Sequence, residues 1–122
     1  MGPAGRVYAV DINPKLLERI ARRSREQGLN NVQSVLARED SAELPPNAVD
    51  LVFLCDTYHH FEHPEGTMAS IHRALRPGGQ LVVVDFQRLP GVSRAWVLDH
   101  VRAGQDGVAR EIIDAGFELT NV

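Results

Sequence analysis

Residues 5–14 read G-R-V-Y-A-V-D-I-N-P, and this stretch decides the fold. Residues 7–10 are apolar throughout, which is typical of a strand buried on both faces of a parallel sheet. Asp11 puts a carboxylate at the strand tip. Asn13 and Pro14 then favour the start of a helix, as N-cap and first helical residue. A strand, an acidic tip and a helix indicate an α/β sheet edge that can hold a nucleotide ribose, or simply a carboxylate that caps the turn at Asn13.

Strands and helices alternate along the rest of the chain. The predicted strands are residues 7–10, 32–36, 49–55 and 80–86, with the start of a fifth at 117–122. The predicted helices run from Pro14 to Gly28, from Pro64 to the turn Pro77-Gly78-Gly79, and over 108–115 before Gly116, with a short one at 96–101. We therefore expect a single α/β domain over residues 1–122, with a parallel sheet and helices on both faces.

Composition excludes several classes of partner. The chain has 122 residues, 43% of them hydrophobic, and a formal net charge of −3, so it lacks the basic surface that nucleic-acid binding requires. No apolar segment has the length of a membrane span, and the first residues do not form a signal peptide. The single cysteine, Cys55, cannot form an internal disulfide. We expect a cytoplasmic protein that binds neither nucleic acid nor membrane.

Three segments together resemble the class I S-adenosylmethionine-dependent methyltransferases. They are residues 5–14, residues 49–60 (V-D-L-V-F-L-C-D-T-Y-H-H) and residues 74–86 (A-L-R-P-G-G-Q-L-V-V-V-D-F), and their order and spacing also match. The Y-H-H-F run and D-A-G-F-E-L at 114–119 are similar to the small-molecule branch that contains the ubiquinone and menaquinone biosynthesis C-methyltransferases. The resemblance implies a Rossmann-like fold, S-adenosylmethionine as cofactor and a small-molecule methyl acceptor.

The resemblance also implies roles for residues at the cofactor's nucleoside end. Asp11 would accept hydrogen bonds from both ribose hydroxyls, and Ile12 would lie against the adenine. The contact to the adenine amino group falls on Asp40 when counted back from Leu44-Pro45, and on Arg38 when counted forward from Leu36. Both assignments stay open.

Residues after the third strand are expected at the cofactor's other end. By the resemblance, Cys55 and Asp56 would face the methionine part and the incoming acceptor, and Tyr58, His59 and His60 would follow at the mouth of the cleft. Methyl transfer needs no enzyme thiol, and a cysteine in an apolar run is commonly a small core residue.

His59 and His60 are the candidate general bases, although either could instead pack the cleft wall or cap the helix at Pro64. With Glu62 and His63 they form a group of metal-ligand types. Adjacent histidines in such a loop point apart, so we expect no metal site.

The family's glycine-rich loop, D-x-G-x-G-x-G, has no counterpart in these residues. By the family's sheet order, its strand would lie between the strands that end at Asp11 and Cys55. We therefore expect an N-terminally truncated domain without the first strand and helix of the methyltransferase fold. Its two strand pairs would either flank a gap or pair directly. In either case cofactor binding and activity should be impaired, so whether this chain is an enzyme stays open.

Two other functional classes remain as alternatives. One is a non-catalytic remnant or interaction module, which would bury its open sheet edge against a partner chain or a second copy of itself. The other is an NAD-dependent oxidoreductase, because Asp11 would suit an NAD ribose equally well. The Y-H-H-F and L-R-P-G-G contexts and the lack of a Tyr-x-x-x-Lys pair disfavour the oxidoreductase.

Overall fold

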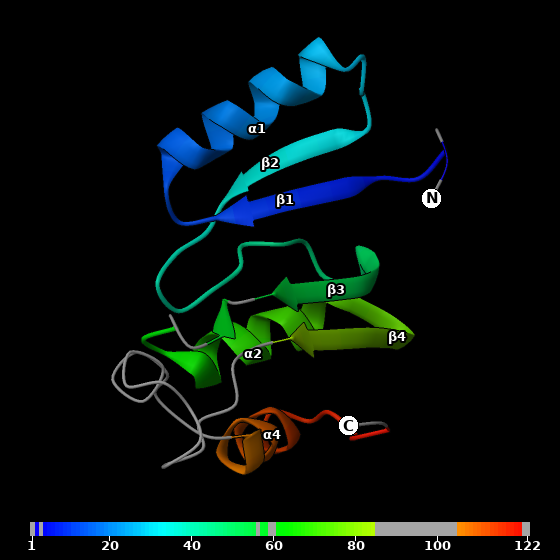
Figure 1. The fold of residues 1–122 in the computed structure, drawn as a ribbon. Helices are drawn as coiled ribbons and strands as arrows, with labels where there is room; N and C mark the ends of the chain where they lie inside the picture. The colour runs from blue at the N-terminus through cyan, green and yellow to red at the C-terminus, as the bar shows by residue number, and fades with distance from the viewer. Residues whose placement is uncertain (1, 3, 56, 59–60, 85–104, 121–122) are drawn as a thin grey trace.

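The computed structural model describes residues 2, 4–55, 57–58, 61–84 and 105–120, which form alternating strands and helices (Figure 1). The elements are β1 (Val7–Asp11), α1 (Pro14–Glu26), β2 (Val32–Leu36), β3 (Val49–Cys55), α2 (Pro64–Ala74), β4 (Leu75–Val84) and α4 (Gln105–Asp114). No helix in the described ranges is both long and apolar enough to cross a membrane.

The strands form two separate parallel pairs. In the first, β1 pairs with β2, with Val7 opposite Val32 and Asp11 opposite Leu36. In the second, β3 pairs with β4, with Cys55 opposite Val84. Within the described ranges β1 is not hydrogen-bonded to β3, although all four strands point the same way and these two are the inner ones (Figure 1). We expected the two strand pairs either to flank a gap or to pair directly, and the structure shows the gap.

The start of α1 follows the local sequence signals. The side-chain oxygen of Asn13 accepts a hydrogen bond from the backbone N–H of Lys15 at 2.9 Å, and Pro14 is the first helical residue. The helix ends at Glu26, and Gly28 follows with a φ of +70°, a conformation that suits glycine. Leu17 is the buried residue of α1, which packs against β1 and β2. The predicted N-cap is confirmed.

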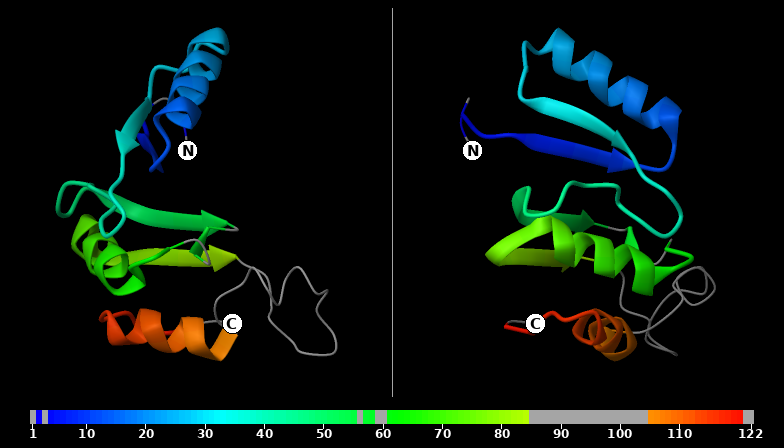
Figure 2. Two further views of the ribbon diagram at one scale, coloured as in Figure 1. Left: turned by 90° about the vertical axis from the view of Figure 1, so that its left-hand side faces the viewer. Right: turned by 180° about the vertical axis from the view of Figure 1, so that it is seen from behind.

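The main core lies between α2 and the pair β3 and β4. Its buried residues are Ala42, Tyr58, Met68, Ile71 and Leu75, and Val10 of β1 also packs against them. The two halves of the molecule therefore meet through side chains without a continuous sheet. Views from the side and from behind place α1 and α2 on opposite sides of the strands (Figure 2). The predicted α/β fold with helices on both faces is confirmed.

The boundary between α2 and β4 differs from the prediction. Helical spacing assigned Leu75 to the helix, and Pro77-Gly78-Gly79 was expected to be a turn. Instead α2 ends at Ala74, and β4 already begins at Leu75 because this residue pairs with Val49. Val49 pairs with Leu75 and Leu51 pairs with Gln80, so the pairing register shifts and the residues between Leu75 and Gln80 form an irregularity in β4. Gly78 lies in this irregular segment with a φ of +82°.

At the C-terminal end the predicted fifth strand is wrong for the residues that can be seen. Residues 117–120 have no strand conformation, and Phe117 instead packs edge-on against His72, with ring centroids 5.0 Å apart. Both strand pairs in the described residues form without this segment. Gly116 follows α4 with a φ of +108°, as the sequence predicted. The short helix expected at 96–101 lies outside the described residues.

Candidate functional site

The tip of β1 presents the Asp11 carboxylate. Its Oδ1 accepts a hydrogen bond from the backbone N–H of Asn13 at 2.9 Å, so the expected turn-capping role is confirmed. A carboxylate has about four acceptor positions on its two oxygens, and this bond occupies one of them. The turn therefore orients Asp11 without using up its capacity to bind two ribose hydroxyls, and that role stays a prediction.

A pocket of about 390 Å³ opens beside this strand tip. It is lined by Ile12, Arg38, Glu39, Asp40 and His63. The structure thus brings together Ile12 and both of the residues that competed for the adenine contact, Asp40 and Arg38. Ile12 is 55% exposed, so it offers an open apolar surface beside polar groups. The volume lies at the low end of small-molecule sites, which span roughly 300–1,000 Å³.

The loop that carries Asp40 is fastened to α2. The backbone N–H of Ala42 donates to Oγ of the buried Ser70 at 2.9 Å, and Ser70 donates onward to the carbonyl of Thr67 at 2.7 Å. Within the loop, the N–H of Arg38 donates to the carbonyl of Ser41 at 2.8 Å, which closes a tight turn. These bonds attach the loop that carries Arg38, Glu39 and Asp40, the polar lining of the pocket, to α2.

Gly66 of α2 lets the loop approach closely, which gives a testable prediction. A Cβ at this position would lie 2.8 Å from the backbone oxygen of Asp40, closer than such atoms can approach. Alanine normally stabilises a helix by about 1 kcal/mol relative to glycine. We expect Gly66→Ala to lose this benefit and to pay about 1–3 kcal/mol for overpacking. Urea denaturation measures the change.

The matched control is Gly107→Ala, at an exposed helical position in α4. This variant should show the ordinary stabilisation of alanine. Equal stabilisation by both substitutions would mean that the Asp40 loop does not rest against α2 as described.

The residues predicted for the cofactor's methionine end are not brought into this pocket. Cys55 is exposed at the end of β3 and does not line the pocket. Asp56, His59 and His60 lie outside the described residues, so their roles stay predictions.

Tyr58 was expected at the cleft mouth, and this is wrong. Its side chain is 0% exposed in the core. Its hydroxyl donates to Oε2 of Glu111 in α4 at 2.6 Å, and its ring packs edge-on against Phe61 at 5.4 Å. A tyrosine can be buried in this way when its hydroxyl finds a partner.

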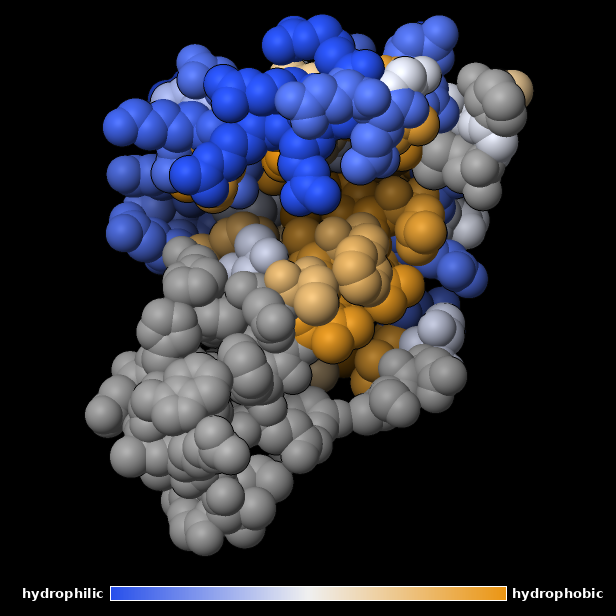
Figure 3. Space-filling model, turned by 45° about the horizontal axis from the view of Figure 1, so that its top comes forward, coloured by the Kyte–Doolittle hydropathy of each residue, from blue (hydrophilic) through white to orange (hydrophobic). Residues whose placement is uncertain are grey.

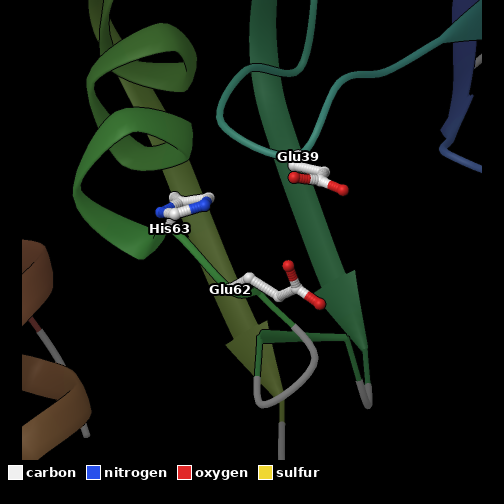
Figure 4. A group of neighbouring side chains, drawn as sticks. All are labelled: Glu39, Glu62 and His63. Atoms are coloured by element: carbon white, nitrogen blue, oxygen red, sulfur yellow. The ribbon is translucent and has the colours of Figure 1, made fainter.

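One cluster beside the pocket was not foreseen as a unit. Figure 4 shows Glu39 on the loop after β2 facing Glu62 and His63, which precede α2. Their ligand atoms lie within 4.8 Å of one another, and all three residues are exposed. The sequence drew attention to Glu62 and His63, but Glu39 joins them through loop docking that no local pattern predicts. Carboxylate and imidazole can bind a divalent cation, yet solvated clusters of this kind are common without one, and we assign no metal.

Comparison with known proteins places this geometry in context. A family model described as a methyltransferase domain matches residues 1–83. A ubiquinone/menaquinone biosynthesis C-methyltransferase, UbiE, from Ectopseudomonas mendocina is 35% identical over 92 residues, which cover 75% of this chain and 36% of the relative. The UbiE of Pasteurella multocida is 27% identical over 150 residues, covering 99% of this chain and 56% of the relative. The chain thus spans about a third to just over half of these relatives' lengths.

Solved structures share the fold. A SAM dependent methyltransferase from Aquifex aeolicus superposes with a TM-score of 0.86 and 23% identity, covering 98% of this chain and 63% of that one. The [4+2]-cyclase SpnF superposes with a TM-score of 0.84 and 22% identity, covering 97% and 44%. At these identities the likeness shows the fold alone, and the cyclase illustrates that one fold can host different reactions. Neither the relatives nor the structures support the oxidoreductase alternative.

Proposed function

From the premise that this chain belongs to the methyltransferase domain family, we propose that its pocket binds the nucleoside part of S-adenosylmethionine. We further propose that the complete protein transfers the cofactor's methyl group to a small molecule. The observation that supports this most directly is the pocket that combines Ile12 with Asp40 and Arg38. The family resemblance assigned these positions to the adenine, and Ile12 lies far from the other two along the chain.

The pocket's residues fit a nucleoside. Ile12 offers an apolar surface on which a flat base can lie, and Asp40 or Arg38 can bond polar groups at the base's edge. Asp11, the preceding residue, would accept hydrogen bonds from the ribose hydroxyls. The volume of about 390 Å³ suits the nucleoside half of the cofactor better than the whole. Binding by this chain should therefore be weak.

The cofactor supplies its own chemical activation, because its sulfonium makes the methyl group ready for direct displacement. The protein's task is then to align the acceptor, exclude water and remove a proton where the acceptor carries one. We propose His59 or His60 for the proton and Cys55 with Asp56 for contacts at the methionine end. The acceptor is proposed to be a small molecule, by analogy with the UbiE relatives.

Titration with S-adenosylmethionine tests the proposal. We expect a Kd in the millimolar range, which corresponds to about −4 kcal/mol. The amide NMR shifts of Ile12, Arg38 and Asp40 should move saturably with added cofactor, and NAD at the same concentrations should not move them. Micromolar affinity by calorimetry would refute the impairment, and the absence of saturable shifts at these three amides would refute the pocket assignment.

A further inference from the structure

The outer edge of β2 is a strand edge without the usual protection. β2 pairs with β1 in an unbroken parallel register and lies on the far side of β1 from β3 (Figure 1). Among the strands that the structure describes, none is hydrogen-bonded to that outer side. Proteins commonly protect such an edge with a lysine, a proline, a bulge or a covering segment. The strand reads V-Q-S-V-L, so it carries no charge and no proline, and its pairing contains no bulge.

Alternate residues of β2 turn their backbone groups outward. The carbonyl of Asn31 and the N–H of Ala37 both bond to β1, so the odd-numbered residues of this segment face β1. Because the direction alternates along a strand, the N–H and C=O groups of Val32, Ser34 and Leu36 point away from β1. Each of these residues therefore offers one donor and one acceptor at the outer edge.

This edge is complementary to a second copy of itself. Consider two β2 strands that run antiparallel about a twofold axis at Ser34. Ser34 then lies opposite its own counterpart, and Val32 lies opposite Leu36 of the second copy. All of these residues face outward, so each opposite pair can exchange two backbone hydrogen bonds. The side chains of opposite residues also lie close together, and this places valine beside leucine. Leu36 is 54% exposed in the single chain, so its side chain is accessible for this contact.

The charges near β2 do not oppose this pairing. α1 packs on the strands through its Leu17 side, and by the helical period the exposed Arg19 and Arg22 lie on the opposite side of the helix. Figure 3 shows hydrophilic residues gathered at the molecule's top, where α1 lies. Beyond the strand, the same register places Arg38 opposite Asn30, so no like charges meet along the edge.

We propose that the outer edge of β2 is a self-association surface, at which two copies of this chain pair antiparallel and join their strands in the order β1-β2-β2-β1. Main-chain hydrogen bonds provide affinity in such strand addition, and side-chain pairs provide the register. The pairing extends a sheet that has only two strands in the single chain. A twofold interface uses the same edge of both copies, so association at this edge stops at the dimer.

Analytical ultracentrifugation of the intact 122-residue chain, without cofactor, tests the proposal. We expect the mass to rise from that of a monomer to that of a dimer as the protein concentration increases. Hydrogen exchange locates the contact. The amides of Val32, Ser34 and Leu36 should exchange at least about tenfold more slowly in the dimer, because newly bonded amides are protected. The amides of Gln33 and Val35, which face β1, should change little.

Ser34→Lys and Gln33→Lys form a matched pair of variants. Each adds one positive charge at an exposed position to a chain of net charge −3. Only Ser34→Lys places two like charges directly opposite each other, because residue 33 lies opposite Val35 in this register. The dimer Kd should rise at least about fivefold for Ser34→Lys and by no more than about twofold for Gln33→Lys.

Mixing two variants separates loss of pairing from loss of folding. Ser34→Glu alone should weaken the dimer as Ser34→Lys does. An equal mixture of the two variants should dimerise at least as tightly as the unchanged chain, because opposite charges then meet at the axis.

Three results would overturn the proposal. They are a monomer at every concentration, equal changes of Kd for Ser34→Lys and Gln33→Lys, and a mixture that dimerises no more tightly than either variant alone. Residues 33 and 34 do not line the pocket, and the assay contains no cofactor. None of these results therefore bears on S-adenosylmethionine binding.

Discussion

Met68→Ala is expected to destabilise the fold by about 2–5 kcal/mol. Met68 is 0% exposed at the centre of the core, where it lies among Tyr58, Ile71 and Leu75. Truncation removes its buried methylene groups and leaves a cavity that the surrounding helix and strands can fill only in part. Domains of this size have total stabilities of only about 5–15 kcal/mol, so the variant should be close to unfolding. The midpoint of urea denaturation measures the loss.

Two controls separate cavity formation from the mere change of residue. Met68→Leu nearly conserves volume and should cost less than about 1.5 kcal/mol. Leu119→Ala shortens a side chain that is 53% exposed, and its effect should stay within about 0.5 kcal/mol. A loss below about 1 kcal/mol for Met68→Ala would contradict the core as described, because a fully buried methionine cannot be truncated so cheaply.

The parts of the fold that were predictable are those encoded over a few neighbouring residues. The apolar runs of β1, β2 and β3 marked these strands, and β2 and β3 have the predicted bounds. Asn13 and Pro14 fixed the start of α1 because capping depends on adjacent residues. The acidic tip at Asp11 also followed from sequence, since a residue that ends a parallel strand lies at the sheet's carboxyl edge.

What was missed depends on contacts between distant segments. Leu75 fits a helical stripe as well as a strand, and its pairing with Val49 decides between them. Tyr58 looked like a cleft residue, and its burial depends on Glu111 in a helix some fifty residues further along. The cluster of Glu39 with His63 exists because the Asp40 loop docks on α2. No local pattern contains these pairings.

The same distinction applies to the residues of the candidate site. The pocket proposed for the nucleoside draws on the tip of β1 and the loop after β2, and both segments belong to the stretch that the family model matches. The methionine end was assigned instead to the last residue of β3 and the residues after it, and Cys55 is exposed there.

Asp11→Asn should weaken S-adenosylmethionine binding by at least about tenfold, because a hydrogen bond to a charged acceptor contributes about 1.5–3 kcal/mol. The substitution is chosen to preserve the fold. An asparagine Oδ1 can still accept from the N–H of Asn13, which now bonds Asp11 at 2.9 Å. The substitution removes the negative charge and replaces one of the two carboxylate oxygens by an NH₂ group. A pair of ribose hydroxyls needs both oxygens as charged acceptors. The amide shifts of Ile12 and Asp40 during cofactor titration give the affinity.

Glu39→Gln is the matched control, since Glu39 lines the same pocket and the change removes the same charge. It should alter the affinity by no more than about twofold, in line with the small effect of one solvated charge. Equal losses in the two variants would show that Asp11 acts through general electrostatics and not through the ribose. Unchanged affinity in Asp11→Asn, with the Asn13 amide shift preserved, would mean that the strand tip only caps its turn.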